Sequence, residues 1–289
     1  MHALADKVKL AERAVLAAGA HLNSHCSSGN QVTVSFKDDS SMVMNLDIEC
    51  QRIIKDILGN ALPVAAEEDE ESHAFIDSSG DYFTVDPIDG TSSCKRYLGS
   101  VSGGQLGFGP LVGVVCKGKL CGAAYYNVPT ATLYTAQRGE GAKAVKITDA
   151  AKDIDRELPK RSLRIDNPPS LTESALIFFP GSIEELKAVL YLRNTNSIEN
   201  SYRFGGFAND CIRLAEGWEQ VQLQTRVKAW DFAAVLIPIE AGLYAEADPF
   251  GRQVPFDSWT VARSNPVLIA ARPVFDELKR LVRESLSSI

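Results

Sequence analysis

The spacing of apolar residues changes from helical in the first sixty positions to strand-like after them. Apolar side chains recur every three to four residues in 3–22 and again in 47–58, which predicts two amphipathic helices. A polar loop, His25 to Asn30, is expected to follow the first helix. Short apolar runs then predict strands at 63–66 and 82–86 and a meander of strands from Leu111 to Val145.

The second half of the chain alternates between the two kinds of spacing. Residues 147–172 are polar and contain Pro159, Pro168 and Pro169, which indicates a boundary or an exposed excursion. Beyond it, the pattern predicts strands at 174–179, 220–224 and 266–270, and helices at 183–192, 208–216, from about 231 and at 274–286. We therefore expect an α/β fold of layered helices and sheets, with an N-terminal α+β part (1–146) and a C-terminal α/β part (147–289).

Composition narrows the function classes. Of the 289 residues, 45% are hydrophobic and 23% charged, and the formal net charge is −7. An acidic chain does not favour nucleic-acid binding, which needs clustered Lys and Arg. No apolar run is long enough for a membrane span or a signal peptide. The six cysteines are scattered without C-x-x-C spacing, which suits a reducing compartment, although Cys116 and Cys121 could face one another. We expect a cytoplasmic protein.

One segment carries a strong chemical signal, Asp86-Pro87-Ile88-Asp89-Gly90-Thr91-Ser92. Two carboxylates three residues apart follow an apolar strand, with Pro87 fixing the backbone between them and Gly90 permitting a tight turn. Such a bend can aim both carboxylates and the Ile88 carbonyl at one point, which is the oxygen-rich environment that Mg²⁺ prefers. The alternative for Asp89-Gly90 alone is an ordinary turn with a helix cap.

Other acidic or basic candidates are weak in isolation. Five acids in a row, Glu67 to Glu71, usually form a solvated loop. Asp231 after Trp230 is by itself a helix cap, and Asp47 a helix start. His21 and His25 lie four apart on a predicted helix, where we favour a surface role over a metal site.

The order and spacing of these motifs resemble the inositol monophosphatase family of metal-dependent, lithium-sensitive phosphatases. That family has a Glu-Glu motif, an Asp-Pro-Ile/Leu-Asp-Gly-Thr motif and a Trp-Asp motif, matched here by Glu67-Glu68, Asp86–Thr91 and Trp230-Asp231. The similarity extends from Lys37 to Ala271. It implies a layered α-β-α-β-α fold like that of fructose-1,6-bisphosphatase.

The resemblance also implies roles for individual residues. Two or three Mg²⁺ ions would be bound by Glu67, Asp86, Asp89, Asp231 and the Ile88 carbonyl. A water activated for attack would lie beside Glu67 and beside Thr91, which Asp47 orients. Substrate would contact Gly90, Thr91, Ser92, Gly205, Gly206 and Gln224. The chain departs from the family at Met44, where a Thr is usual, and at Ser93-Cys94, in place of Asn-Phe. It also has Gly205-Gly206 where the family has Gly-Thr, and Gln224 in place of a Glu seven residues before Asp231.

Three functions stay open at this point. The first is a Mg²⁺-dependent phosphomonoesterase of a small phosphorylated metabolite, of the inositol monophosphatase type. The second is a 3′(2′),5′-bisphosphate nucleotidase, whose sequences share loops like Lys37–Ser40 and Glu67–Asp69. The third is a non-catalytic relative that binds metal or phosphate. A homodimer and inhibition by lithium are further expectations from the resemblance.

Overall fold

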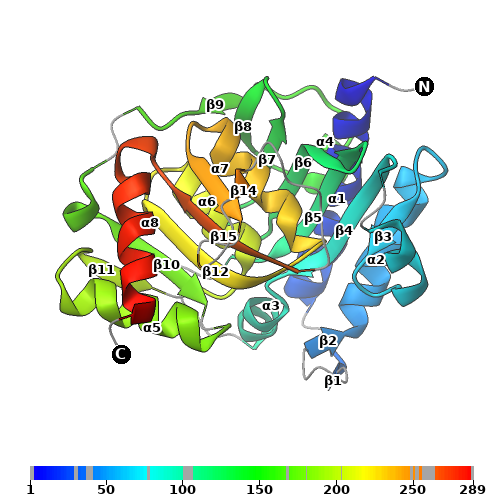
Figure 1. Ribbon diagram of the computed structural model, residues 1–289. Helices are drawn as coiled ribbons and strands as arrows, with labels where there is room; N and C mark the ends of the chain where they lie inside the picture. Colours follow the sequence, from blue (N-terminus) through cyan, green and yellow to red (C-terminus); the bar gives the residue numbers. More distant parts are fainter. Residues whose placement is uncertain are drawn as a thin grey trace.

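Five layers of helices and sheets make up the fold, in the order helix, sheet, helix, sheet, helix (Figure 1). The computed structural model describes residues 3–28, 32–36, 42–76, 79–99, 107–166, 169–179, 181–202, 204–247, 250, 254–255 and 264–287. Each sheet is therefore covered by helices on both faces, which explains why its strands are apolar along most of their length. The layered α/β fold expected from the sequence is confirmed.

The first sheet has seven strands in the order β3-β4-β5-β6-β7-β8-β9. Its strands are β3 (Val64–Ala66), β4 (Tyr82–Asp89), β5 (Gly109–Cys116), β6 (Lys119–Asn127), β7 (Thr132–Gln137), β8 (Gly141–Lys146) and β9 (Arg161–Leu163). Neighbours are antiparallel except β3 and β4, which are parallel. The predicted meander thus forms most of the sheet, and β9 adds an edge strand from beyond residue 146. The division of the chain at 146 stays a prediction.

Two long helices cover the outer face of this sheet, α1 (Leu4–Ser28) and α2 (Asn45–Leu58) (Figure 1). Their buried residues recur at helical spacing, as in Val8, Ala11, Val15, Ala18 and Leu22. The expected loop from His25 is wrong in part, because α1 continues through it to Ser28 and its polar residues form the last turn. A short hairpin, β1 (Val34–Phe36) and β2 (Met42–Met44), precedes α2. The Lys37-Asp38-Asp39 segment lies outside the described residues.

The second sheet has six strands in the order β11-β10-β12-β15-β13-β14. Its strands are β10 (Ala175–Phe179), β11 (Asn200–Tyr202), β12 (Val221–Lys228), β13 (Tyr244–Ala247), β14 (Val254–Pro255) and β15 (Ser264–Ala270). Helices α5 (Ile183–Asn194) and α8 (Arg272–Ser287) cover its outer face (Figure 1). Strands β11, β13 and β14 are too short to have produced a clear periodic signal.

The middle layer contains α6 (Phe207–Ala215), the 3₁₀ helix η3 (Asp231–Val235) and α7 (Leu236–Glu240), which contact both sheets. The helix expected from about residue 231 therefore begins as a 3₁₀ turn. The polar stretch 147–172 also contains structure, namely α4 (Ala150–Asp153), β9 and the turn η2 (Leu171–Glu173). The remaining elements are η1 (Glu70–Phe75), after β3, and α3 (Thr91–Leu98), after β4.

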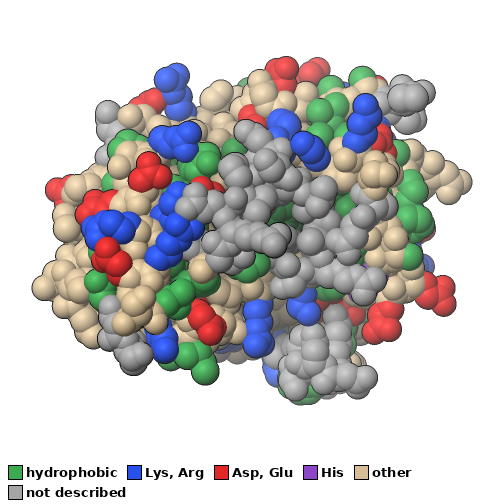
Figure 2. Space-filling model, in the orientation of Figure 1, with side chains coloured by type: hydrophobic (Ala, Val, Ile, Leu, Met, Phe, Trp, Pro, Cys, Tyr) green, Lys and Arg blue, Asp and Glu red, His purple; other side chains and the backbone are tan. Residues whose placement is uncertain are grey.

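The cysteines, the surface charges and the helix lengths bear on the expectations drawn from composition. All six thiols are free, and those of Cys116 and Cys121 contact each other across the β5–β6 turn. On the face shown in Figure 2, Lys and Arg side chains lie among Asp and Glu side chains. None of the helices in the described ranges combines the length and apolar character that a membrane crossing requires.

Candidate active site

An irregularity in β4 brings two carboxylates to the same side of the first sheet. All eight residues of β4 are buried, and its pairing with β5 shifts between Asp86, opposite Leu111, and Asp89, opposite Gly109. Three steps along β4 therefore correspond to two along β5, which is a β-bulge. In a regular strand, residues three apart point to opposite faces. The extra residue at the bulge, where Pro87 lacks an N–H, turns Asp86 and Asp89 toward one another.

The backbone immediately after Asp89 reverses into a helix. Gly90 has φ 82° and ψ 38°, a left-handed conformation that disfavours residues with a Cβ, and α3 begins at Thr91. The amides of Ser93 and Cys94 donate to the Gly90 carbonyl oxygen at 2.8 and 3.0 Å. At the bulge itself, Asp86 Oδ1 accepts a 2.9 Å hydrogen bond from the Ile88 amide. These contacts fix the strand-to-helix turn that carries the motif.

Asp231, 142 positions beyond Asp89, completes a three-carboxylate cluster. One oxygen from each of Asp86, Asp89 and Asp231 lies within 4.8 Å of the others. Strand β12 leads to this residue, and Asp231 Oδ2 accepts a 3.3 Å hydrogen bond from the Lys228 amide. Burial, followed by the negative charges of neighbouring acids, raises the pKa of Asp86 and of Asp231 well above the ordinary carboxyl value. The interaction between the Asp86 and Asp231 side chains acts on both groups, raising the pKa of Asp86 and lowering that of Asp231.

Asp89 also faces the start of α6. Burial raises its pKa to about 7, while the backbone amides of Ala208, Phe207 and Asn209 act in the opposite direction. Gly206, the residue before α6, makes this approach possible, because a Cβ there would lie 2.7 Å from Asp89 Oδ1. That buried oxygen has no hydrogen-bond partner among the described residues. Asp89 therefore combines a carboxylate anchored beside a helix N-terminus with one oxygen left for a further ligand.

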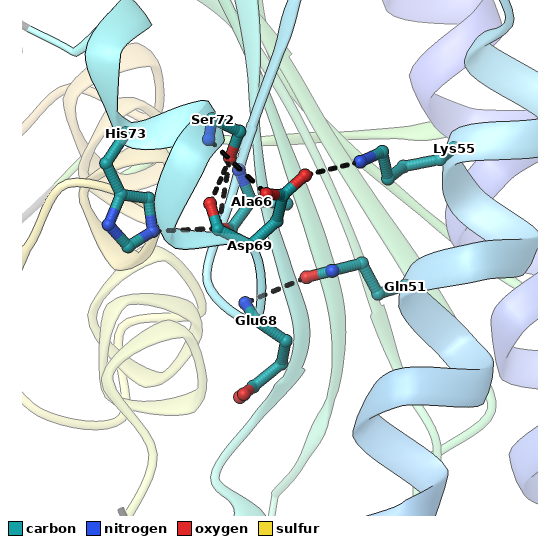
Figure 3. A network of polar contacts seen from close by, with 7 residues as sticks. All are labelled: Gln51, Lys55, Ala66, Glu68, Asp69, Ser72 and His73. Carbon is teal, nitrogen blue, oxygen red and sulfur yellow. Dashed lines mark hydrogen bonds and ion pairs between the residues drawn. The ribbon is translucent and has the colours of Figure 1, made fainter. Parts of the chain in front are cut away.

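Glu67 begins an acidic loop. Figure 3 shows the contacts that hold the next two residues of this loop, Glu68 and Asp69, in place. From α2, Lys55 Nζ contacts Asp69 Oδ2 at 2.6 Å, and Gln51 Oε1 accepts from the Glu68 amide at 2.9 Å. The Glu67 amide donates to the Val85 carbonyl at 3.0 Å. The first three acids of the run thus form an ordered loop, whereas the last two, Glu70 and Glu71, are exposed in the first turn of η1. Glu67 lies outside the 4.8 Å group, but its charge helps raise the pKa of all three aspartates.

His73 is a site neighbour that the sequence analysis missed. Its Nε2 lies 2.9 Å from the carbonyl oxygen of Ala66, the residue before Glu67. Its ring stacks on Trp230 at 4.8 Å between centroids, with an interplanar angle of 28°. The imidazole therefore links the acidic loop to the residue that precedes Asp231. No local pattern around His73 signals this contact, because its partner is more than 150 positions away.

The Thr91 hydroxyl, at the end of the same motif, contacts a further buried carboxylate, that of Asp47. Thr91 Oγ1 is 3.1 Å from the Ile88 carbonyl oxygen and 3.4 Å from Asp47 Oδ1. Asp47 is 1% exposed, and its Oδ2 accepts a 2.7 Å hydrogen bond from the amide of Met44. Because the donor is a backbone N–H, this hydrogen bond does not depend on whether Met or Thr stands at position 44. The carboxylate is held with one oxygen directed at Thr91.

The other residues expected to contact substrate lie in different surroundings. Ser92 is exposed in the first turn of α3. Gly205, with φ 100°, lies against Ser93, whose buried hydroxyl oxygen has no hydrogen-bond partner in the described part of the chain. Gln224 is buried at the bulge of β12, where its Oε1 accepts from Gln222 Nε2 at 3.4 Å. Their substrate contacts stay predictions.

The donor set fits a hard divalent cation. All candidate ligands are oxygens, and Mg²⁺ binds carboxylates and carbonyls at about 2.0–2.1 Å while keeping several waters. Ionised carboxylates that lie this close together repel one another, and a cation or protons that neutralise their charge remove the repulsion. Asp89 Oδ1, which has no hydrogen-bond partner within the described ranges, is an atom that a cation could contact.

Comparisons with known proteins agree with the motifs. A model of the inositol monophosphatase family matches residues 4–274. The Nus factor SuhB of Pasteurella multocida is 26% identical over 288 residues, covering 98% of this chain and 95% of its own. An inositol-1-monophosphatase of Rhizobium meliloti is 27% identical over 259 residues, covering 88% and 89%. The solved structure of the extragenic suppressor protein SuhB of Bartonella henselae has the same fold, with a TM-score of 0.73 at 21% identity over 96% of this chain and 99% of its own. The match over nearly the whole chain, together with the motifs and the fold, shows that this protein belongs to the inositol monophosphatase family, a family of phosphatases.

Proposed function

We propose that this chain is a Mg²⁺-dependent phosphomonoesterase that hydrolyses a small phosphorylated metabolite. The observation that carries the proposal is the cluster of Asp86, Asp89 and Asp231 together with the Thr91–Asp47 pair. Two or three Mg²⁺ ions would be held by these aspartates, Glu67 and the Ile88 carbonyl. Bound there, they would supply positive charge to offset a phosphate dianion and its leaving group.

The protein's own groups position the water. When the Thr91 hydroxyl donates to Asp47 Oδ1, its lone pairs can accept a hydrogen bond from a water in front of the phosphate. The water oxygen forms a bond to phosphorus and the ester P–O bond breaks. The leaving oxygen takes one of the two protons of the water and departs as an alcohol, and the other proton stays on the released phosphate. Amides at the start of α3, near Gly90 and Ser92, would hold the phosphate oxygens.

Gln224 favours a second candidate within the same chemistry, a 3′(2′),5′-bisphosphate nucleotidase. A buried neutral amide can donate as well as accept hydrogen bonds, and it carries no charge that would repel a second phosphate.

We place the enzyme in the cytoplasm and expect a homodimer, both as proposals from the composition and the family.

Phosphate release from a panel of phosphorylated metabolites, measured with Mg²⁺ and with excess chelator, tests the proposal. Wild-type protein should release phosphate only with Mg²⁺, and Thr91→Ala should lower kcat much more than it changes KM. Undiminished release in chelator would overturn the metal mechanism. Absence of turnover on every monoester and bisphosphate, by a folded protein that binds Mg²⁺, would favour the non-catalytic alternative.

A further inference from the structure

A second group of potential metal ligands lies between α1 and α2, the two side-by-side helices of the outer layer (Figure 1). His21 and His25 are one helical turn apart on α1, with ring centroids 4.6 Å apart and an interplanar angle of 61°. Glu49 on α2 reaches them, with Oε2 at 2.7 Å from His21 Nε2. One ligand atom of each residue lies within 4.8 Å of the other two. The three side chains therefore converge, which the sequence analysis did not predict.

Polar contacts with groups outside the ligand atoms orient the side chains of Glu49 and His25. Asn45 Nδ2 donates to Glu49 Oε1 at 3.0 Å, which leaves Oε2 facing the imidazoles. His25 Nδ1 makes a long contact, 3.4 Å, with the His21 carbonyl oxygen. A proton on that nitrogen leaves Nε2 with a free lone pair. Metal-binding histidines and carboxylates in proteins are commonly oriented by contacts of this kind.

The cluster is separate from the proposed active site. Asp47 and Glu49 are two residues apart on α2, or about 200° around the helix axis, so they face different neighbours. Asp47 is almost completely buried against Thr91, whereas the side chains of His21 and Glu49 are 27% and 36% exposed. An ion can therefore enter from solvent, and water can complete its coordination.

We propose that His21, His25 and Glu49 form a second metal site, selective for a borderline transition ion of the Zn²⁺ class. Two imidazoles and one carboxylate with an open position are a common zinc ligand set, whereas Mg²⁺ prefers oxygen. Tetrahedral bonds of about 2.0–2.1 Å place ligand atoms roughly 3.4 Å apart. The 2.7 Å contact between His21 and Glu49 would open slightly, and the wider separations would close by side-chain rotation.

Binding of the metal ion would displace the proton on His21 Nε2 and would link α1 to α2. The proton that His21 Nε2 donates to Glu49 leaves that nitrogen, either for Nδ1 or for water, when the lone pair binds the ion. The bound ion would cross-link α1 to the first half of α2. Metal binding to the folded state alone raises its stability in proportion to the logarithm of the ion concentration.

Cobalt(II) spectroscopy and Zn²⁺ calorimetry on the full chain, both in millimolar Mg²⁺, test the site. We expect one equivalent of Co²⁺ to produce visible d–d bands of a four- or five-coordinate nitrogen–oxygen site, and Zn²⁺ to compete for it. His25→Gln and Glu49→Gln should each weaken Zn²⁺ binding at least about tenfold and remove the bands. Two matched variants should keep both signals: His73→Gln, a histidine outside the cluster, and Asp89→Asn, which disrupts the acidic cluster.

Several results would overturn the proposal. Unchanged Zn²⁺ affinity in His25→Gln and Glu49→Gln would leave the cluster as a hydrogen-bonded contact between the two helices. Loss of binding in Asp89→Asn alone would assign the ion to the acidic cluster. Near-ultraviolet thiolate charge-transfer bands that disappear in Cys116→Ser would assign it to the thiols. Imidazole ¹⁵N shifts of the wild-type protein, recorded with and without Zn²⁺, give the same answer without any variant: shifts confined to His21 and His25 support the site, and unshifted rings refute it.

Discussion

Replacement of Asp89 by Asn should stabilise the metal-free protein while abolishing turnover. The side chain is 3% exposed, and its pKa is raised from 3.8 to about 7. A difference of about three pKa units between the folded and unfolded states corresponds to about 4 kcal/mol at pH 8. This is an upper limit, because the Asn oxygen accepts less strongly from the α6 amides. At about 2 °C per kcal/mol, the melting temperature of the chelated protein should rise by up to about 8 °C.

The direction of the pH dependence follows from the raised pKa. Between pH 3.8 and about 7, folded Asp89 holds more protons than unfolded Asp89, so the metal-free protein loses stability as pH rises through this window. The gain from Asp89→Asn should therefore be larger at pH 8 than at pH 5. Thermal unfolding followed by circular dichroism in excess chelator measures it at both values. Asp56→Asn, an exposed carboxylate on α2, is the matched control and should change little.

Two outcomes would refute this reasoning. If Asp89→Asn melts at or below the wild-type temperature at both pH values, the carboxylate is satisfied by the α6 amides and not strained by its acidic neighbours. If the variant keeps more than about a tenth of the wild-type rate, Asp89 is a turn residue and the proposed metal cluster loses a ligand.

The remaining predictions concern Mg²⁺, substrate choice and packing. Mg²⁺ should raise the melting temperature more at pH 8 than at pH 5, because protons compete with it for Asp86 and Asp231, whose pKa values are raised; an equal rise would count against binding at this cluster. Gln224→Glu should increase the ratio of kcat/KM for inositol monophosphate over adenosine 3′,5′-bisphosphate about tenfold or more, since a charged acceptor is worth roughly 1.5–3 kcal/mol. An unchanged ratio would show that this residue does not line the pocket. Gly206→Ala should reduce kcat/KM for the best substrate at least about tenfold, because its Cβ would lie 2.7 Å from Asp89 Oδ1, whereas Gly99→Ala, with contacts of 3.4 Å or more, should not. Equal activity in the two variants would contradict the packing argument.

Local sequence patterns predicted the parts of the fold that depend on neighbours in the chain. The helical spacing of 3–22 and 47–58 and the apolar runs of the first sheet identified their elements, because each pattern reports which face is buried. Two limits are evident. A polar last turn gave no signal that α1 continues to Ser28, and β13 and β14 are short strands that pair with each other and, in the case of β13, with β15. Short strands of this kind have too few residues for a period to be recognised.

The same distinction applies to the site. The Asp86–Thr91 segment could be recognised as a metal-binding motif from the sequence, because its carboxylates, its proline and its glycine lie in one short stretch. The contact of Asp89 with the α6 amides, and the stacking of His73 on Trp230, join residues far apart in sequence. The pair His21 and His25 was interpreted as a surface feature because Glu49, which converges on them, lies on another helix. Single residues become recognisable as part of a site only when their long-range partners are known.

The bulge in β4 makes the length of this strand part of the chemistry. A substitution at any of the remaining positions of β4 changes a side chain but leaves it pointing to the same layer. The loss of one residue between Asp86 and Asp89 would instead remove the bulge and leave the two carboxylates in line on one face, about 6.6 Å apart along a regular strand. The gain of one residue beside the bulge would turn one of the carboxylates to the opposite face of the sheet. Over evolutionary time this segment can therefore diverge by substitution but not by insertion or deletion. The count of residues across the bulge should be more strictly preserved among active relatives than the identity of any residue between the two aspartates.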